Sequence, residues 1–206
     1  GVPAVPNVLG TPDSRFSGRE RSVDPANAGK QVRPAGSCGY LHVYTGDGKG
    51  KTTAAFGLAV RALCAGQSVY IGQFVKSMRY NETKIEGIFD RMRIEQLGRG
   101  CFIGHDPEPA DVGMAREGLA RCRALLVSGE YDLVILDELT IALYYRLLTV
   151  DEVLDALRAR HPSVEVVVTG RYAPQELVDE ADLVTEMREV KHYYTQGVLS
   201  REGIDR

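Results

Sequence analysis

The chain has 206 residues, a hydrophobic fraction of 44% and a formal net charge of −3. That length suits one α/β domain with its own core, and the hydrophobic fraction is ordinary for a globular protein. The small negative charge gives no reason to expect nucleic-acid binding, and no apolar run approaches membrane-spanning length. The four cysteines form no C-x-x-C pair, so neither a zinc knuckle nor a redox motif is indicated. We expect a cytoplasmic protein with reduced thiols.

Residues 1–37 differ in composition from the rest of the chain. Five of the nine prolines lie here, among scattered glycine, serine and charged residues without sustained hydrophobic periodicity. We predict a flexible or loosely packed tail over 1–37 and one compact domain over 38–206. The tail lacks the continuous apolar core of a signal peptide. A segment that folds over a bound ligand is the functional alternative.

The domain opens with the pattern of a phosphate-binding loop. Residues 40–44 alternate like a strand, and the next eight residues read T-G-D-G-K-G-K-T, close to G-x-x-x-x-G-K-[ST] with Thr45 at the first glycine position. From Thr53 apolar residues recur at helical spacing, and Gly66 is placed to end that helix. Glycines let backbone N–H groups approach a polyphosphate closely, at the positive end of a helix. Lys51 would supply a mobile charge, and the Thr52 hydroxyl would reach Mg²⁺.

Further strands and helices alternate along the rest of the chain. We predict strands at 68–75, 93–97, 131–136, 164–169 and 183–187, the last as a core strand, and helices from 111 and from 149, with a short helix that has Pro174 in its first turn. Asp111 is expected to cap its helix, and Thr149 with Glu152 forms a capping box. The alternation predicts an α/β fold, a mostly parallel sheet with helices on both faces.

Polar side chains follow several of these strands, at the sheet edge where ligands bind in such folds. Gln73 and Lys76 end the second strand, Asp137 and Glu138 follow the apolar strand 131–136, and Arg171 follows the next one. A carboxylate in the position of Asp137 holds Mg²⁺ directly or through water, and Glu138 beside it could bind metal or act as a base. Lys76 could pair with phosphate, or be a solvated surface lysine. These residues indicate a Mg²⁺-nucleotide-binding protein, and an ATPase, a kinase and another ATP-using transferase all remain open.

Several stretches taken together resemble the ATP:corrinoid adenosyltransferases of the CobA/CobO type, a P-loop class with a RecA-like single domain. They are the loop with its flanks at 44–57, Q-F-V-K at 73–76, D-E-L-T at 137–140, T-G-R at 169–171, K-H at 191–192 and G-I-D at 203–205. The resemblance runs from about residue 39 to the end. It implies an enzyme that transfers the 5′-deoxyadenosyl group of ATP to the Co(I) of a reduced corrinoid and releases triphosphate. Since the corrinoid carries the nucleophile, the protein positions the substrates and stabilises charge.

The resemblance also implies roles for individual residues. Lys51, Thr52 and Glu138 would be catalytic, and Thr52, Asp137 and Glu138 would hold Mg²⁺ or Mn²⁺. The residues expected to bind ATP or corrinoid are Thr45, Gly46, Asp47, Gly48, Lys49, Gly50, Lys51, Thr52, Thr53, Gln73, Lys76, Phe102 and Arg171. Family members place ATP in the reverse sense along the loop, which leaves C5′ open to cobalt. Phe102 would displace the lower ligand of the corrinoid, in a chain that has no Trp.

The resemblance further implies a homodimer and an electron-donor protein such as a flavodoxin. Two alternatives belong to other functional classes. A P-loop nucleoside or nucleotide kinase would need an arginine-bearing lid, for which Arg91 and Arg99 are candidates. A non-catalytic module would bind ATP or corrinoid without turnover.

Overall fold

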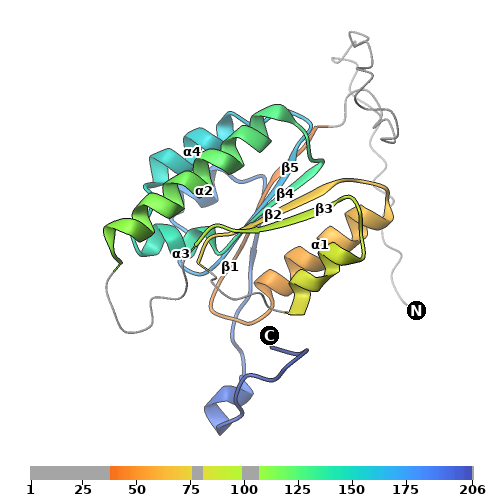
Figure 1. The fold of residues 1–206 in the computed structure, drawn as a ribbon. Helices are drawn as coiled ribbons and strands as arrows, with labels where there is room; N and C mark the ends of the chain where they lie inside the picture. The colour runs from red at the N-terminus through yellow and green to blue at the C-terminus, as the bar shows by residue number, and fades with distance from the viewer. Residues whose placement is uncertain (1–37, 76–80, 99–106, 206) are drawn as a thin grey trace, which may run out of the picture. The chain divides into compact units, whose positions relative to one another are not determined.

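A computed structural model describes residues 38–75, 81–98 and 107–205, and they contain a six-stranded sheet in the order β3-β2-β4-β5-β1-β6 (Figure 1). All five strand pairs are parallel. The strands are β1 Leu41–Thr45, β2 Val69–Gln73, β3 Met92–Gln96, β4 Leu133–Asp137, β5 Glu165–Thr169 and β6 Leu183–Glu186. The predicted α/β class with a parallel sheet is confirmed. The tail at 1–37, Lys76, Arg99 and Phe102 lie outside the described residues.

Helices cover both faces of the sheet. They are α1 Lys51–Cys64, α2 Pro109–Ser128, α3 Leu139–Tyr144, α4 Val150–Arg158 and α5 Gln175–Glu180, with 3₁₀ turns η2 Asn81–Gly87 and η3 Tyr193–Gln196. α1 lies on one face, where Phe56 and Leu63 share a core with Ile71 and Ile135. α2, α3 and α4 lie on the other face (Figure 1). Within the described residues, no helix is long and apolar enough to cross a bilayer.

The N-terminal caps of α4 and α2 test two predictions made from the sequence. The predicted capping box of α4 is present, because Glu152 N–H donates to Thr149 Oγ1 over 3.2 Å and Thr149 N–H donates to Glu152 Oε2 over 2.8 Å. The prediction that Asp111 is the N-cap of α2 is wrong. Glu108 is the N-cap and Asp111 is the third helical residue, whose carboxylate accepts from the Glu108 N–H over 2.8 Å. Proline at 109 suits the first helical position, which is why the helix begins earlier than expected.

The last strand has a different environment from the one predicted. β6 forms one edge of the sheet and pairs only with β1 among the described strands, and Leu183 and Val184 are 42% and 41% exposed. It is therefore not a core strand. A short apolar run has the same appearance in a sequence whether it lies inside a sheet or along its edge.

Candidate active site

The phosphate-binding loop joins β1 to α1, as predicted, and its conformation depends on glycine. Gly46 and Gly50 have φ values of 98° and 121°, which side chains rarely tolerate. The Gly48 N–H donates to the Met187 carbonyl over 2.6 Å, so the chain leaving β6 supports the loop from behind. At Gly50 no side chain caps the start of α1, and the first N–H groups of the helix are thus available to an anion.

Gly46→Ala is expected to displace the loop, because a Cβ there would overlap the Met187 carbonyl oxygen and the φ of 98° would be strained. We expect ATP binding to weaken at least ~10-fold and the free energy of unfolding to fall by about 2 kcal/mol, measured by titration and urea denaturation. Gly57→Ala is the matched control. A Cβ at this position in α1 would meet none of the described atoms within 4 Å, so stability should stay equal or rise by up to about 1 kcal/mol. Unchanged ATP affinity in Gly46→Ala would contradict the loop assignment.

Lys51 lies folded over this loop and is only 7% exposed. Its Nζ donates to the carbonyl oxygens of Gly46 at 2.6 Å and Gly48 at 2.8 Å. Burial is the main cause that lowers the pKa of Lys51, and the positive charge of Arg171 lowers it further, against the carboxylates of Glu138 and Asp47. A bound polyphosphate would place further negative charge beside this ammonium and so favour its charged form.

Asp137 ends β4 and holds three side chains from elsewhere in the sequence. Its Oδ1 accepts from Thr52 Oγ1 at 2.8 Å and from Thr169 Oγ1 at 2.7 Å, and its Oδ2 accepts from Gln73 Nε2 at 3.0 Å. Asp137 is fully buried and is not among the residues that line the cavity described below. Because Thr52 gives its hydrogen to this carboxylate, the lone pairs of its hydroxyl oxygen face away from Asp137, available to a cation.

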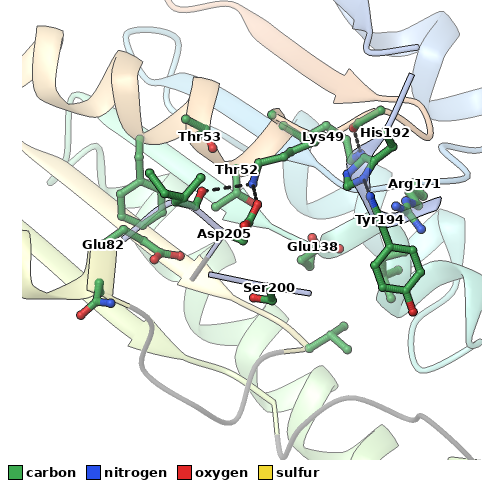
Figure 2. Close-up of a pocket in the computed structure, with 18 of the residues that line it drawn as sticks. Lys49, Thr52, Thr53, Glu82, Glu138, Arg171, His192, Tyr194, Ser200 and Asp205 are labelled. Atoms are coloured by element: carbon green, nitrogen blue, oxygen red, sulfur yellow. Dashed lines mark hydrogen bonds and ion pairs between the residues drawn. The ribbon is translucent and has the colours of Figure 1, made fainter. Parts of the chain in front are cut away.

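Glu138 begins the turn into α3 and its side chain lines the cavity (Figure 2). Its backbone is left-handed, with φ of 60°, and its N–H donates to Thr169 Oγ1 over 3.0 Å. A non-glycine residue in this conformation is strained by about 1 kcal/mol or more, which often marks a functional position. Thr169 thus fixes both neighbouring acidic residues, since it donates to Asp137 and accepts from Glu138.

Arg171 follows β5 and reaches the loop, where its Nη2 donates to the Asp47 carbonyl over 3.2 Å. The turn that carries it is held by Thr140, whose Oγ1 donates to the Arg171 carbonyl over 2.6 Å. Gly170 has a φ of 135°, and a Cβ there would overlap Thr140 Oγ1. The D-E-L-T and T-G-R motifs are therefore in contact with each other.

The residues near the C-terminus also contact the loop. Lys49 Nζ lies 2.9 Å from Asp205 Oδ1 and donates to the Ile204 carbonyl over 3.2 Å (Figure 2). Asp205 accepts in addition from the Tyr193 hydroxyl and from the Arg201 N–H. Hydrogen bonds from Lys49 first and Tyr193 second hold the pKa of Asp205 well below its usual range. The G-I-D motif thus contacts the loop at Lys49, and His192 of the K-H motif lines the cavity described below.

These elements enclose a cavity of about 950 Å³. The predicted site residues that line it are Gly48, Lys49, Gly50, Lys51, Thr52, Thr53, Glu138 and Arg171. Thr45 at the end of β1 and Gly46 and Asp47 of the loop directly precede them, and Gln73 and Asp137 are buried behind Thr52. The structure therefore brings together every predicted site residue that it describes.

The sequence reasoning missed the aromatic part of the cavity. Five of the ten tyrosines line it, namely Tyr144, Tyr145, Tyr172, Tyr193 and Tyr194. Two Tyr-Tyr doublets, one just after D-E-L-T and one just after K-H, were the available signal. Only 7% of the residues are aromatic, so paired tyrosines directly after two binding motifs are unusual in this chain.

A glycine loop at the N-terminus of a helix, with a buried aspartate at the end of a strand two places away in a parallel sheet, defines a P-loop nucleotide-binding protein. The model of the family described as ATP:corrinoid adenosyltransferase BtuR/CobO/CobP matches residues 37–205. The chain belongs to this family, as the motifs of the sequence had indicated.

Two curated relatives and one solved structure illustrate these similarities. The corrinoid adenosyltransferase of Escherichia coli K12 is 33% identical over 193 residues, which are 94% of this chain and 98% of the relative. That of Pseudomonas aeruginosa is 37% identical over 171 residues, 81% of this chain and 83% of the relative. The crystal structure of the flagellar accessory protein FlaH from Methanocaldococcus jannaschii superposes with a TM-score of 0.52 at 12% identity, over 73% of this chain and 71% of FlaH, and shares the fold.

Proposed function

We propose that this protein binds ATP and a reduced corrinoid in the cavity beside the loop 46–50 and transfers the 5′-deoxyadenosyl group to cobalt. The Co(I) electron pair forms the Co–C5′ bond, the C5′–O bond breaks, and triphosphate leaves with the electron pair of the broken C5′–O bond. The observation that best supports this proposal is the position of Lys51. It is a buried cation that lies over the loop, and no side chain caps the start of the helix that follows the loop. Such a site is suited to a leaving group that gains negative charge.

The chain's own residues have three tasks in this proposal. Lys51 and the N–H groups at the start of α1 bind the triphosphate, and Arg171 extends the positive surface along the cavity. Asp137 fixes Thr52, and Thr169 fixes Asp137 and Glu138. With the triphosphate held at the loop, C5′ is presented to the corrinoid at a lower entropic cost.

Oxygen ligands at this site suit Mg²⁺ or Mn²⁺. Thr52 and Glu138 line the cavity and would hold the cation, while Asp137 would orient Thr52 from behind. Among the described residues no group of three or more His, Cys, Asp or Glu could hold a metal by itself, so phosphate and water oxygens would complete the ligand set. The cation would neutralise charge on the triphosphate.

Homodimer formation, a flavodoxin-type electron donor and the reversed direction of ATP belong to the same proposal. They come from the family resemblance. Arg91 is the lid candidate that lies within the described residues, and it does not support the kinase alternative. Its Nη1 donates to the Gly66 carbonyl, which follows the C-terminal end of α1, whereas the phosphate-binding loop precedes the N-terminal end.

The test is an anaerobic reaction of the protein with MgATP and chemically reduced cob(I)alamin, followed by the visible spectrum and by triphosphate release. We expect light-sensitive adenosylcobalamin with one triphosphate per turnover. Chelation by EDTA should lower the rate by roughly 10²-fold or more, and added Mg²⁺ should restore it. ATP binding without a cobalt–carbon product would favour the binding module, and phosphoryl transfer to a nucleoside would favour the kinase.

A further inference from the structure

Two tyrosines from elements other than the phosphate-binding loop form an aromatic surface in the cavity. The ring centroids of Tyr144 and Tyr172 lie 4.4 Å apart with an interplanar angle of 30°. Tyr145 contacts Tyr144 edge-on, at 5.3 Å and 79°, and is itself partly buried against the core. Although they stack on each other, Tyr144 and Tyr172 remain 56% and 54% exposed. All three line the cavity.

One of the two tyrosines has an unfavourable backbone conformation, which the surrounding structure maintains. Tyr172 has a φ of 59°, which is an outlier for a bulky side chain. The turn before it is fixed by the Thr140–Arg171 hydrogen bond of 2.6 Å. At the other ring, α3 ends immediately after Tyr144, where the Leu147 N–H donates to Ala142 and the left-handed Arg146 reverses the chain. A strained aromatic residue that stays half exposed in a cavity suggests a ligand for its free face.

The tyrosine pair is connected to the phosphate-binding loop through Arg171. Arg171 donates to the Asp47 carbonyl of the loop, and Tyr172 is the next residue along the chain. Arg171, Tyr144 and Tyr172 line the same cavity as Lys51 and Thr52. A nucleotide has this same polarity, with a polyphosphate at one end and a flat, uncharged heteroaromatic base at the other.

We propose that Tyr144 and Tyr172 form a stacking surface for the adenine base of ATP. The inference rests on the proposed function and names the part of the site that holds the base. Aromatic side chains stack on the faces of bases, whereas a corrin ring is much wider, partly saturated and surrounded by amide side chains. With the base on the tyrosines and the triphosphate on the loop, the C5′–O bond between them is held from both sides. The two tyrosines are positioning residues for the base.

Tyr172→Gly tests the proposal without endangering the fold, because glycine relieves the φ of 59°. We expect the Kd for MgATP to rise roughly ten-fold in Tyr172→Gly and further in Tyr144→Ala with Tyr172→Gly. The Kd for inorganic tripolyphosphate with Mg²⁺, measured by the same calorimetry, should stay unchanged. The preference for ATP over CTP should shrink. Tyr144→Phe and Tyr172→Phe keep the rings and should bind ATP within about two-fold of the unaltered protein.

Two results would overturn the proposal. In one, the double variant binds ATP as the unaltered protein does, with or without a raised KM for the corrinoid. In the other, affinity for ATP and for tripolyphosphate falls by the same factor, which would indicate a structural role. Failure of the proposed function is distinguishable, because the unaltered protein would then bind ATP and still form no adenosylcobalamin.

Discussion

Lys51→Ala is expected to reduce adenosyl transfer by roughly 10²–10³-fold, a rise of about 3–4 kcal/mol in the activation barrier. Triphosphate gains negative charge as the C5′–O bond breaks, and Lys51 is the buried cation at the loop that would receive it. Since this charge is largest in the transition state, kcat should fall more than the affinity for ATP. Single-turnover formation of adenosylcobalamin under anaerobic conditions measures the effect.

Lys84→Ala provides a matched control for that substitution. Lys84 is an exposed lysine on η2, and its Nζ donates to Asn81 Oδ1 over 2.6 Å. Activity within about two-fold of the unaltered protein is expected, as for surface changes in general. Near-normal transfer by Lys51→Ala would remove the loop from the mechanism.

Asp137→Asn is the second substitution with a large expected effect. The amide keeps the shape of the carboxylate but replaces one acceptor oxygen by an N–H₂ donor, although Thr52, Thr169 and Gln73 all donate to this group. At least one of these buried donors would lose its partner. We expect the free energy of unfolding to decrease by about 1–3 kcal/mol and transfer activity to fall by roughly 10²-fold, because a neutral amide holds the Thr52 hydroxyl less strongly than the carboxylate does.

Urea denaturation and the Mg²⁺ dependence of the rate measure these two effects. The Mg²⁺ concentration for half-maximal rate should rise in Asp137→Asn, because the Thr52 hydroxyl is held less strongly and the negative charge behind it is lost. Asp155→Asn, on the exposed side of α4, should change neither quantity appreciably. A stable Asp137→Asn variant with normal Mg²⁺ dependence would separate Asp137 from the metal site.

The local parts of the site were predictable from the sequence because their signals are local. The strand, the glycine loop and the start of α1 are contiguous, and the Thr149 capping box spans four residues. The environment of Asp137 was not predictable. The sequence predicts that a carboxylate after an apolar strand holds Mg²⁺ directly or through water, and this stays a prediction. What the structure adds is that Asp137 is a buried acceptor for side chains from β2, α1 and β5.

The tyrosine surface was missed for the same physical reason. Tyr144 follows β4 and Tyr172 follows β5, and they meet because these two strands are neighbours in the sheet. Strand order depends on tertiary packing, which hydrophobic periodicity does not report. The exposed edge position of β6 escaped prediction likewise.

The place of β1 in the sheet affects how the protein is made. β1 is the first of the described strands in chain order, yet it lies between β5 and β6, with Tyr44 paired to Thr169 and Thr45 to Glu186. The Gly48 N–H likewise bonds to Met187. During translation, the whole T-G-D-G-K-G-K-T motif therefore leaves the ribosome long before the segments that shape it. Closing such long loops slows folding, and ATP can stabilise only chains that have been synthesised through β6.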